Sequence, residues 1–273
     1  MSGGGMKCVY GVGVLTALVE EYELTEPDIM VASSGSVANG AYYLSGQYRD
    51  VIAAWLAVLG DKRLISFARK KVFDIDYLID EIFKKRFPFD FKKLASSRTK
   101  FFFTATRVRD GKTVFMKLPK TKAIYEHLRA AKAIPFIYGK EVRIGRASYI
   151  DGDFGANTPD LVAKAITEGA THILVVEHEP NLDLKRGRTL MLRALSLIEK
   201  ISGKKGIANA AVRELKTSVL SPQMLSRTIV LSPSKPLGLR TLSKSKLRLR
   251  KGFNLGYADA TNSKELKSLL GQK

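Results

Sequence analysis

Short apolar segments of strand type alternate with helix-like segments along the first two thirds of the sequence. Ile29–Val31 and His172–Val176 are two of the strand candidates, and helix-like segments at about 36–45, 121–132 and Asp160–Glu168 lie between them. Such an alternation is typical of a sheet whose strands are connected by helices that pack on its two faces. The sequence therefore predicts an α/β fold with three layers, α/β/α, around a mostly parallel sheet.

Other segments predict local structure. Residues 50–95 are helix-like, and Asp110-Gly111 is a hairpin signal between two strand candidates. A long basic helix is expected after residue 185. From Ser232 onward we expect loops, with a short helix near 262–270.

The apolar run at Ile29–Val31 ends in the small residues Ala32-Ser33-Ser34-Gly35-Ser36, and a helix-like stretch follows. A serine on a sharp turn from strand to helix has the geometry of a nucleophile elbow, because the turn projects its hydroxyl above the sheet. The N–H of Gly35 and the helix dipole would favour negative charge there. A small-residue turn without chemistry is the alternative, since such turns are common.

Two further segments have residues suited to a reaction site. Consecutive glycines, as in Gly3-Gly4-Gly5, let backbone N–H groups approach a ligand oxygen without hindrance from a Cβ atom. The spacing fits neither a phosphate-binding Walker loop nor a dinucleotide fingerprint. Asp151 follows a short apolar strand candidate and precedes Gly152, so its carboxylate is a candidate base at a strand end. A flexible terminus and an ordinary turn are the respective alternatives.

These segments together resemble the patatin-like phospholipase family. The family's marks are a glycine-rich start, a serine turn and a later Asp-Gly pair, and this chain has GGGMK at 3–7, ASSGS at 32–36 and DGD at 151–153, in that order. Further similarity lies in AAKAIP at 130–135, and in NTP at 157–159 followed by GATHILVV at 169–176. The resemblance covers about residues 2–180, and we expect residues 1–180 to form the catalytic core. Residues 181–273 would be a basic part that packs on the same domain.

The resemblance implies a lipid acyl hydrolase that uses a Ser-Asp dyad and requires no cofactor or metal. Ser34 would attack the ester carbonyl, and Asp151 would accept its proton and later activate water. The Gly3-Gly4-Gly5 amides, with Met6, Lys7 and Gly35 beside them, would bind the oxyanion and substrate, and Lys7 would orient the loop or meet a lipid phosphate. The substrates would be phospholipids or other acyl esters.

The sequence departs from the family pattern at several positions. Ala32 and Ser36 replace glycines around the serine, Cys8 stands where a glycine is common, and Asp153 adds a second carboxylate that would raise the pKa of one of the pair. Only Met1 and Ser2 precede the glycines, so we expect an empty position in the sheet and a glycine loop untethered at one end. Restoring apolar residues upstream would then raise stability and activity.

Positive charge increases strongly toward the C-terminus. The net charge is +20, with 2 basic and 6 acidic residues (−4) in 1–60 but 20 basic and 5 acidic residues (+15) in 181–273. Such a field attracts anionic lipid or nucleic acid. Leu237–Lys251, with six basic residues among leucines, is the best candidate contact with an anionic membrane. A solvated basic face with no specific partner explains the charge equally well.

Three alternatives to the dyad enzyme follow from the sequence. A Ser-Asp-His triad would use His178 or, less plausibly, His172. A degenerate family member would bind lipid without hydrolysing it. A nucleic-acid-binding module would explain the charge but leave the ordered motifs unexplained, so we expect no nucleic acid partner. The lone Cys8, the lack of a signal peptide and the lack of a membrane-spanning apolar run favour a cytoplasmic protein that associates peripherally with membranes.

Overall fold

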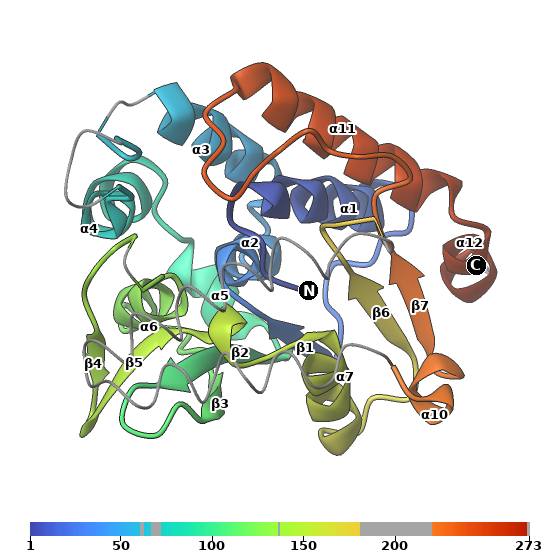
Figure 1. Cartoon of the computed structure of the whole chain (residues 1–273). Coiled ribbons are helices and arrows are strands. Elements are labelled where there is room, and N and C mark those ends of the chain that lie inside the picture. Colours follow the sequence, from blue (N-terminus) through green and yellow to red (C-terminus); the bar gives the residue numbers. More distant parts are fainter. Residues whose placement is uncertain (61–62, 67–71, 136, 181–219, 272–273) are drawn as a thin grey trace.

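The computed structural model describes residues 1–271 except 61–62, 67–71, 136 and 181–219. Its centre is a five-stranded sheet, beside which lies a sheet of two parallel strands (Figure 1). The larger sheet contains β1 (Ile29–Ala32), β2 (Lys100–Arg107), β3 (Thr113–Lys117), β4 (Val142–Ile144) and β5 (Ala147–Asp151), and the smaller one contains β6 (Ile173–Val176) and β7 (Thr228–Leu231).

Helices pack on both faces of the larger sheet, which confirms the predicted three-layer α/β class. The described helices are η1 (Gly5–Cys8), α1 (Val9–Glu20), α2 (Gly35–Leu44), α3 (Tyr48–Gly60), α4 (Ile75–Tyr77), η2 (Leu78–Arg86, a π-helix), α5 (Phe91–Ser96), α6 (Ile124–Ala131), η3 (Gly152–Phe154), α7 (Thr158–Thr167), α10 (Pro222–Leu225), α11 (Lys246–Asn262) and α12 (Lys264–Leu270).

The larger sheet is mixed rather than mostly parallel. Strands β1 and β2 are parallel, whereas β2 with β3, β2 with β5 and β4 with β5 are antiparallel. The Asp110-Gly111 turn returns β3 along β2, and Gly145-Arg146 joins β4 to β5 directly. Connections this short produce antiparallel pairs, because a parallel pair needs a crossover of about a dozen residues.

The residues of β1 and β2 alternate between two hydrophobic clusters. Met30, Phe101 and Phe103 belong to the large cluster beneath α1, α2 and α6. Val31 and Phe102 pack instead with residues of α7 on the opposite face. This period of two is the pattern of a strand that is buried on both sides.

Helix α11 is the largest difference from the sequence prediction, which expected loops through residues 246–262. It packs along α1, and glycines allow the two backbones to approach closely (Figure 1). A Cβ atom added at Gly13 of α1 would lie 2.0 Å from the carbonyl oxygen of Phe253, and one added at Gly256 would lie 2.0 Å from that of Tyr10. Glycine disfavours helix in isolation, so the helix depends on this tertiary contact.

The C-terminal part contributes a strand to the smaller sheet and a helix to the layer that contains α1. Strand β7 pairs with β6 in parallel, and α11 packs on α1. The long basic helix predicted after residue 185 lies outside the described residues. None of the described helices is both long enough and apolar enough to cross a bilayer.

Strands β1 and β5 approach each other end to end along one edge of β2. Phe102 of β2 pairs with both β1 and β3, and Ala105 pairs with both β3 and β5, so β3 occupies one edge and β1 and β5 share the other. Strand β1 runs parallel to β2 and ends opposite Phe103, while β5 runs antiparallel and ends opposite Ala105. The residues that follow β1 therefore lie close to the last residue of β5.

Candidate active site

Ser34 occupies the sharp turn between β1 and α2. Its backbone has φ 50° and ψ −123°, and a positive φ is uncommon for a residue with a side chain and costs about 1–3 kcal/mol. The next residue, Gly35, begins α2, and an added Cβ atom there would lie 2.9 Å from the Cys8 sulfur and 3.2 Å from the Gly5 oxygen. The predicted strand, turn and helix are thus present, and the glycine loop lies beside the serine.

Asp151, the last residue of β5, lies within hydrogen-bond distance of this serine. Ser34 Oγ donates to Asp151 Oδ2 at 2.7 Å, although 117 positions separate the two residues. Asp151 Oδ1 accepts from the N–H of Asp153 at 2.9 Å, and its own N–H donates to the Ala133 carbonyl at 3.1 Å. Both side chains are almost fully buried, with Ser34 4% and Asp151 1% exposed.

Close contact with Thr104 explains why a glycine, Gly152, follows Asp151. A Cβ atom at Gly152 would lie 2.3 Å from both the carbonyl carbon and the Oγ1 of Thr104. Thr104 lies on β2 between Phe103, which pairs with the end of β1, and Ala105, which pairs with the end of β5. Its hydroxyl donates to Ser33 Oγ at 2.8 Å. Thr104 therefore contacts both chain segments that provide the hydroxyl and the carboxylate.

Burial of Asp151 strongly disfavours its charged form. Desolvation raises its pKa to about 7, and the nearby carboxylate of Asp153 contributes to the increase. The hydrogen bonds from Ser34 and from the Asp153 N–H, together with the charge of Lys132, act in the opposite direction. The sequence prediction that Asp153 would raise the pKa of a neighbouring carboxyl is therefore confirmed.

The glycine loop has the backbone conformation that its composition predicts. Gly4 has φ 151° and Gly5 has φ 59°, both in the region that favours glycine. An added Cβ atom at Gly3 would lie 2.4 Å from Asp153 Oδ1, so the loop also contacts the segment that follows Asp151. The loop thus adjoins both halves of the candidate site.

Two predicted loop residues make other contacts. The N–H of Met6 donates to the Thr241 carbonyl at 3.1 Å, and its side chain lines the cavity next to Ser34. Its amide is therefore engaged and is not an oxyanion donor here. Lys7 forms an ion pair with Glu179, which follows β6, so it fixes the loop to the second sheet.

The expectation of an untethered glycine loop is wrong. The nitrogen of Met1 donates to the Val31 carbonyl at 2.9 Å, and its carbonyl accepts from Ser33 N–H at 3.2 Å. The N–H of Ser2 donates to the Val176 carbonyl at 3.0 Å. Residues 1–2 thus lie between β1 and β6, with hydrogen bonds to both.

Ser36 has a structural function at a position where the family pattern has glycine. Its hydroxyl donates to the Ser2 carbonyl at 2.7 Å and lies 3.0 Å from His178 Nε2. His178 is buried, and desolvation lowers its pKa to about 3, so it is neutral. Because this histidine contacts Ser36 rather than Ser34, it does not complete a triad. His172 is exposed and bonds only to its neighbour Thr171 among the described residues.

A narrow apolar cavity of about 60 Å³ adjoins Ser34. Its wall is mainly aliphatic and aromatic, with contributions from Ala38, Tyr42, Trp55, Leu78, Phe83 and Ile134. A wall of this kind suits a hydrocarbon chain. Thr241 and Leu242, from the C-terminal part, also line it.

Lys132 is a charged residue of this cavity that sequence reasoning missed. It is 6% exposed, and its Nζ donates to the carbonyl oxygen of Ser34 at 2.9 Å. Desolvation lowers its pKa to about 8, while the charge of Asp151 opposes the decrease. A lone lysine within the apolar segment AAKAIP was the available signal, because an isolated buried cation is costly unless it has a partner.

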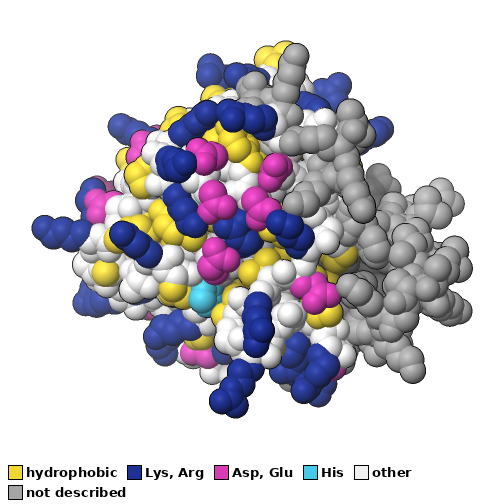
Figure 2. Space-filling model, turned by 90° about the vertical axis from the view of Figure 1, so that its left-hand side faces the viewer, with side chains coloured by type: hydrophobic (Ala, Val, Ile, Leu, Met, Phe, Trp, Pro, Cys, Tyr) yellow, Lys and Arg dark blue, Asp and Glu magenta, His cyan; other side chains and the backbone are white. Residues whose placement is uncertain are grey.

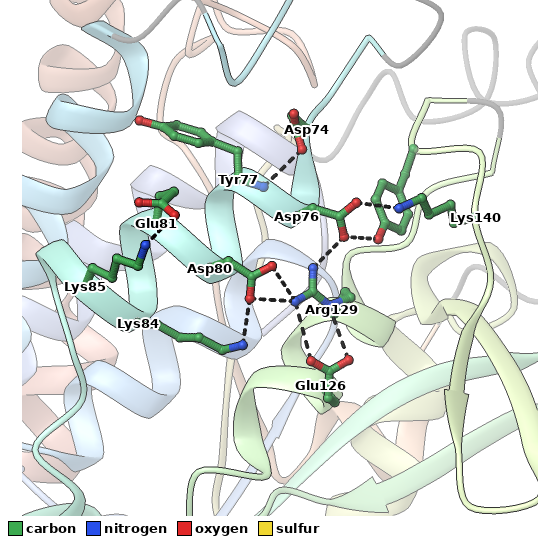
Figure 3. A network of polar contacts seen from close by, with 11 residues as sticks. Asp74, Asp76, Tyr77, Asp80, Glu81, Lys84, Lys85, Glu126, Arg129 and Lys140 are labelled. Carbon is green, nitrogen blue, oxygen red and sulfur yellow. Dashed lines mark hydrogen bonds and ion pairs between the residues drawn. The ribbon is translucent and has the colours of Figure 1, made fainter.

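Helix α6, which precedes Lys132, is held to α4 and η2 by an ion-pair network around Arg129 (Figure 3). The guanidinium contacts Asp76 at 2.5 Å, Asp80 at 2.9 Å and Glu126 at 3.3 Å, and its side chain is only 10% exposed. Burial opposes ionisation of Asp76, but hydrogen bonds from Lys140 and Tyr138 give a net decrease in its pKa. Figure 2 shows acidic side chains gathered among Lys and Arg at the centre of one face. The Arg129 network fixes the end of α6 beside the site.

Among the described residues, no group of three or more His, Cys, Asp or Glu side chains is arranged to hold a metal ion.

The comparisons with known proteins identify a family. No curated protein matches the chain. A model of the family described as patatin-like phospholipase matches residues 1–164, which is more than half of the sequence and includes the serine turn and Asp151. The chain therefore belongs to the patatin-like phospholipase family.

Proposed function

We propose that the protein is a lipid acyl hydrolase with Ser34 as nucleophile and Asp151 as general base. The observation that carries this proposal is the 2.7 Å hydrogen bond from Ser34 Oγ to Asp151 Oδ2 beside an apolar cavity. Membership of the family supports hydrolase chemistry on lipids. The strained backbone of Ser34 supports it too, because such strain is concentrated at functional sites.

The reaction would proceed through an acyl-enzyme. Ser34 Oγ attacks the ester carbonyl carbon while its proton moves to Asp151, and the carbonyl π electrons move to the oxygen. Collapse of this intermediate breaks the bond to the alcohol, which takes the proton from Asp151. Water then repeats the sequence on the acyl-enzyme, with Asp151 as base, and releases the fatty acid and free Ser34.

The oxyanion would be stabilised by backbone N–H groups around Ser34. Gly35 is the first residue of α2, so its N–H has no acceptor within the helix. Gly4 and Gly5 adjoin it with positive φ angles, and we propose their amides as the further donors. Each donor in such a site typically contributes about 3–4 kcal/mol.

The electrostatics of Asp151 support its proposed role at neutral pH. A general base is most effective when its pKa lies near the working pH. The pKa of Asp151, raised to about 7 by burial, meets that condition, whereas an ordinary aspartate would be a much weaker base. The absence of histidine from the contacts of Ser34 among the described residues favours a dyad over a triad.

We further propose that residues 237–251 bring the cavity to an anionic lipid surface. Six basic side chains in this segment are exposed: Arg240, Lys244, Lys246, Arg248, Arg250 and Lys251. Leu247 lies among them with 66% of its surface exposed, while Leu239 and Leu249 are buried. Each such cation contributes about 1 kcal/mol of attraction to an anionic surface. Thr241 and Leu242 of the same segment line the cavity, so binding there would place lipid near Ser34.

Labelling with a fluorophosphonate tests the catalytic proposal. The probe should modify Ser34 in the wild type, as peptide mass spectrometry would show, and should not react with Ser34→Ala. Asp151→Asn should react at least 100-fold more slowly, since removal of a base typically costs that much. Ser96→Ala, an exposed serine on α5, is the control and should label normally. A folded wild type that does not react would refute the proposal.

Flotation with vesicles tests the membrane proposal. Vesicles with anionic lipid should bind the protein at low salt, neutral vesicles should bind it weakly, and high salt should release it. Lys246→Glu with Arg250→Glu should reduce binding more than the same changes at Lys92 and Lys264. Vesicle binding without labelling would favour the lipid-binding, non-catalytic alternative. A salt-sensitive DNA complex without labelling would favour the nucleic-acid alternative.

A further inference from the structure

The end of α6 contacts both members of the proposed dyad. The Ala133 carbonyl accepts from the N–H of Asp151 at 3.1 Å, and the Lys132 ammonium donates to the carbonyl of Ser34 at 2.9 Å. Two adjacent residues thus bond to the segments that carry the hydroxyl and the carboxylate. The Arg129 network fixes this end of α6 one turn earlier (Figure 3).

Burial of the charged Lys132 side chain at this position disfavours the folded state. The side chain is almost fully buried and lines a cavity with an otherwise mostly apolar wall. Among the described residues its ammonium has one hydrogen-bond acceptor, the Ser34 carbonyl. An apolar residue such as methionine would fill the same space without the penalty of burying a cation. Packing alone therefore does not account for a lysine at this position.

From this geometry we propose that Lys132 is a positioning residue for the dyad, whose ammonium holds the Ser34 turn and keeps the Asp151 side chain in its carboxylate form. The inference rests on the proposed function, because it assigns Asp151 as the base. The lysine acts through these neighbours and forms no bond to the reacting ester.

The charged groups around Asp151 define the expected effect. Asp153 from η3 disfavours the carboxylate form of Asp151, and Lys132 from the end of α6 favours it. Cys8, which precedes α1, is a protonated thiol at neutral pH, because burial raises its pKa to about 12. Lys132 is thus the positive charge among these groups, and it acts together with the hydrogen bonds from Ser34 and from the Asp153 N–H.

The pH dependence of Ser34 labelling in Lys132→Met tests the proposal. Removal of the cation should raise the pKa of Asp151 by about one unit or more, so the variant should label about tenfold more slowly at pH 6. The two rates should converge above pH 9, because Asp151 is then ionised in both proteins. Lys92→Met, at an exposed position on α5, is the matched control and should leave the profile unchanged.

Two more variants separate charge from hydrogen bonding and from packing. Lys132→Gln keeps a donor without a charge and should behave like Lys132→Met. Lys132→Arg keeps the charge at all pH values and should restore the midpoint of the wild type. If Lys132→Met does not fold, as judged by near-ultraviolet circular dichroism, the Gln variant supplies the comparison.

A titration of Asp151 by carbon NMR distinguishes failure of this inference from failure of the proposed function. The wild-type protein, labelled at aspartate carboxyl carbons and assigned with Asp151→Asn, should titrate near pH 7 whether or not Ser34 reacts. Absence of labelling in the wild type would refute the hydrolase proposal alone. An unchanged Asp151 midpoint in Lys132→Gln would overturn the function proposed for Lys132.

Discussion

The glycine contact between α1 and α11 makes a quantitative prediction for Gly256→Ala. The new Cβ atom would lie 2.0 Å from the Tyr10 carbonyl oxygen, which is 1.4 Å short of the 3.4 Å at which ordinary contact begins. The obstacle is backbone on both sides, so the helices must separate rather than adjust a side chain. We expect overpacking to cost about 1–3 kcal/mol, against a gain of up to about 1 kcal/mol in helix propensity.

The net result should be a loss of about 1–2 kcal/mol in the free energy of unfolding, measured by urea denaturation, and a decrease of several degrees in Tm. Gly252→Ala is the matched control on the same helix. Its Cβ atom would lie 3.1 Å from Val9 Cγ1 and 3.2 Å from Leu239 Cδ1, which are side-chain ends that can move. We expect that variant to be neutral or slightly stabilised.

The same substitution should also reduce labelling of Ser34. The short helix η1 connects the glycine loop to α1, so a displaced α1 would move the loop amides away from the serine. A Gly256→Ala protein as stable as the Gly252→Ala protein would refute the claim that backbone contact limits the approach of these helices.

Three further predictions concern Asp151 and its neighbours. In the wild type, the rate of Ser34 labelling should increase with pH through a midpoint near 7, because the base must be ionised and its pKa is about 7; a rate independent of pH from 5 to 9 would contradict this. Folding raises the pKa of Asp151 from the ordinary 3.8, so its contribution to stability is fully present below about pH 4 and is lost as the pH rises through 7. As the pH rises from 4 to 8, the free energy of unfolding of Asp151→Asn, measured in urea, should therefore increase relative to that of the wild type by up to about 4 kcal/mol. If the difference between the two proteins does not change with pH, the Asp151 pKa is not perturbed. Gly152→Ala should lower stability by about 1–3 kcal/mol and abolish labelling, because its Cβ atom meets Thr104 at 2.3 Å; normal labelling would mean that this contact does not position Asp151.

Local sequence signals predicted the parts of the site that depend on short segments. The apolar run before Ser34 and the small residues around it identified the turn, and Asn157-Thr158-Pro159 lies at the start of α7, where Asn157 caps the helix with Asp160. The proximity of Ser34 to Asp151 followed only from the family resemblance. No local pattern shows that two strand ends meet along a third strand.

The remaining differences arise from tertiary contacts. The glycines of α11 lower its intrinsic helix propensity, and they stabilise the structure only by allowing α1 to pack closely against α11. The hydrogen bonds of Met1 and Ser2 reach residues about 30 and 174 positions away. Lys132 was overlooked because a single lysine in an apolar segment usually reaches solvent with its charged end, and only its contact with the Ser34 carbonyl shows otherwise.

Because β1 and β5 pair with the same edge of β2, the distance between the Ser34 hydroxyl and the Asp151 carboxylate depends on the number of β2 residues between their pairing partners. Ala32 is opposite Phe103 and Asp151 is opposite Ala105, so a single residue, Thr104, separates the two partners. Insertion of one residue there would lengthen this interval by about 3.3 Å and turn the following side chains to the opposite face. A protein altered in this way could keep every helix and strand and still lose its proposed chemistry.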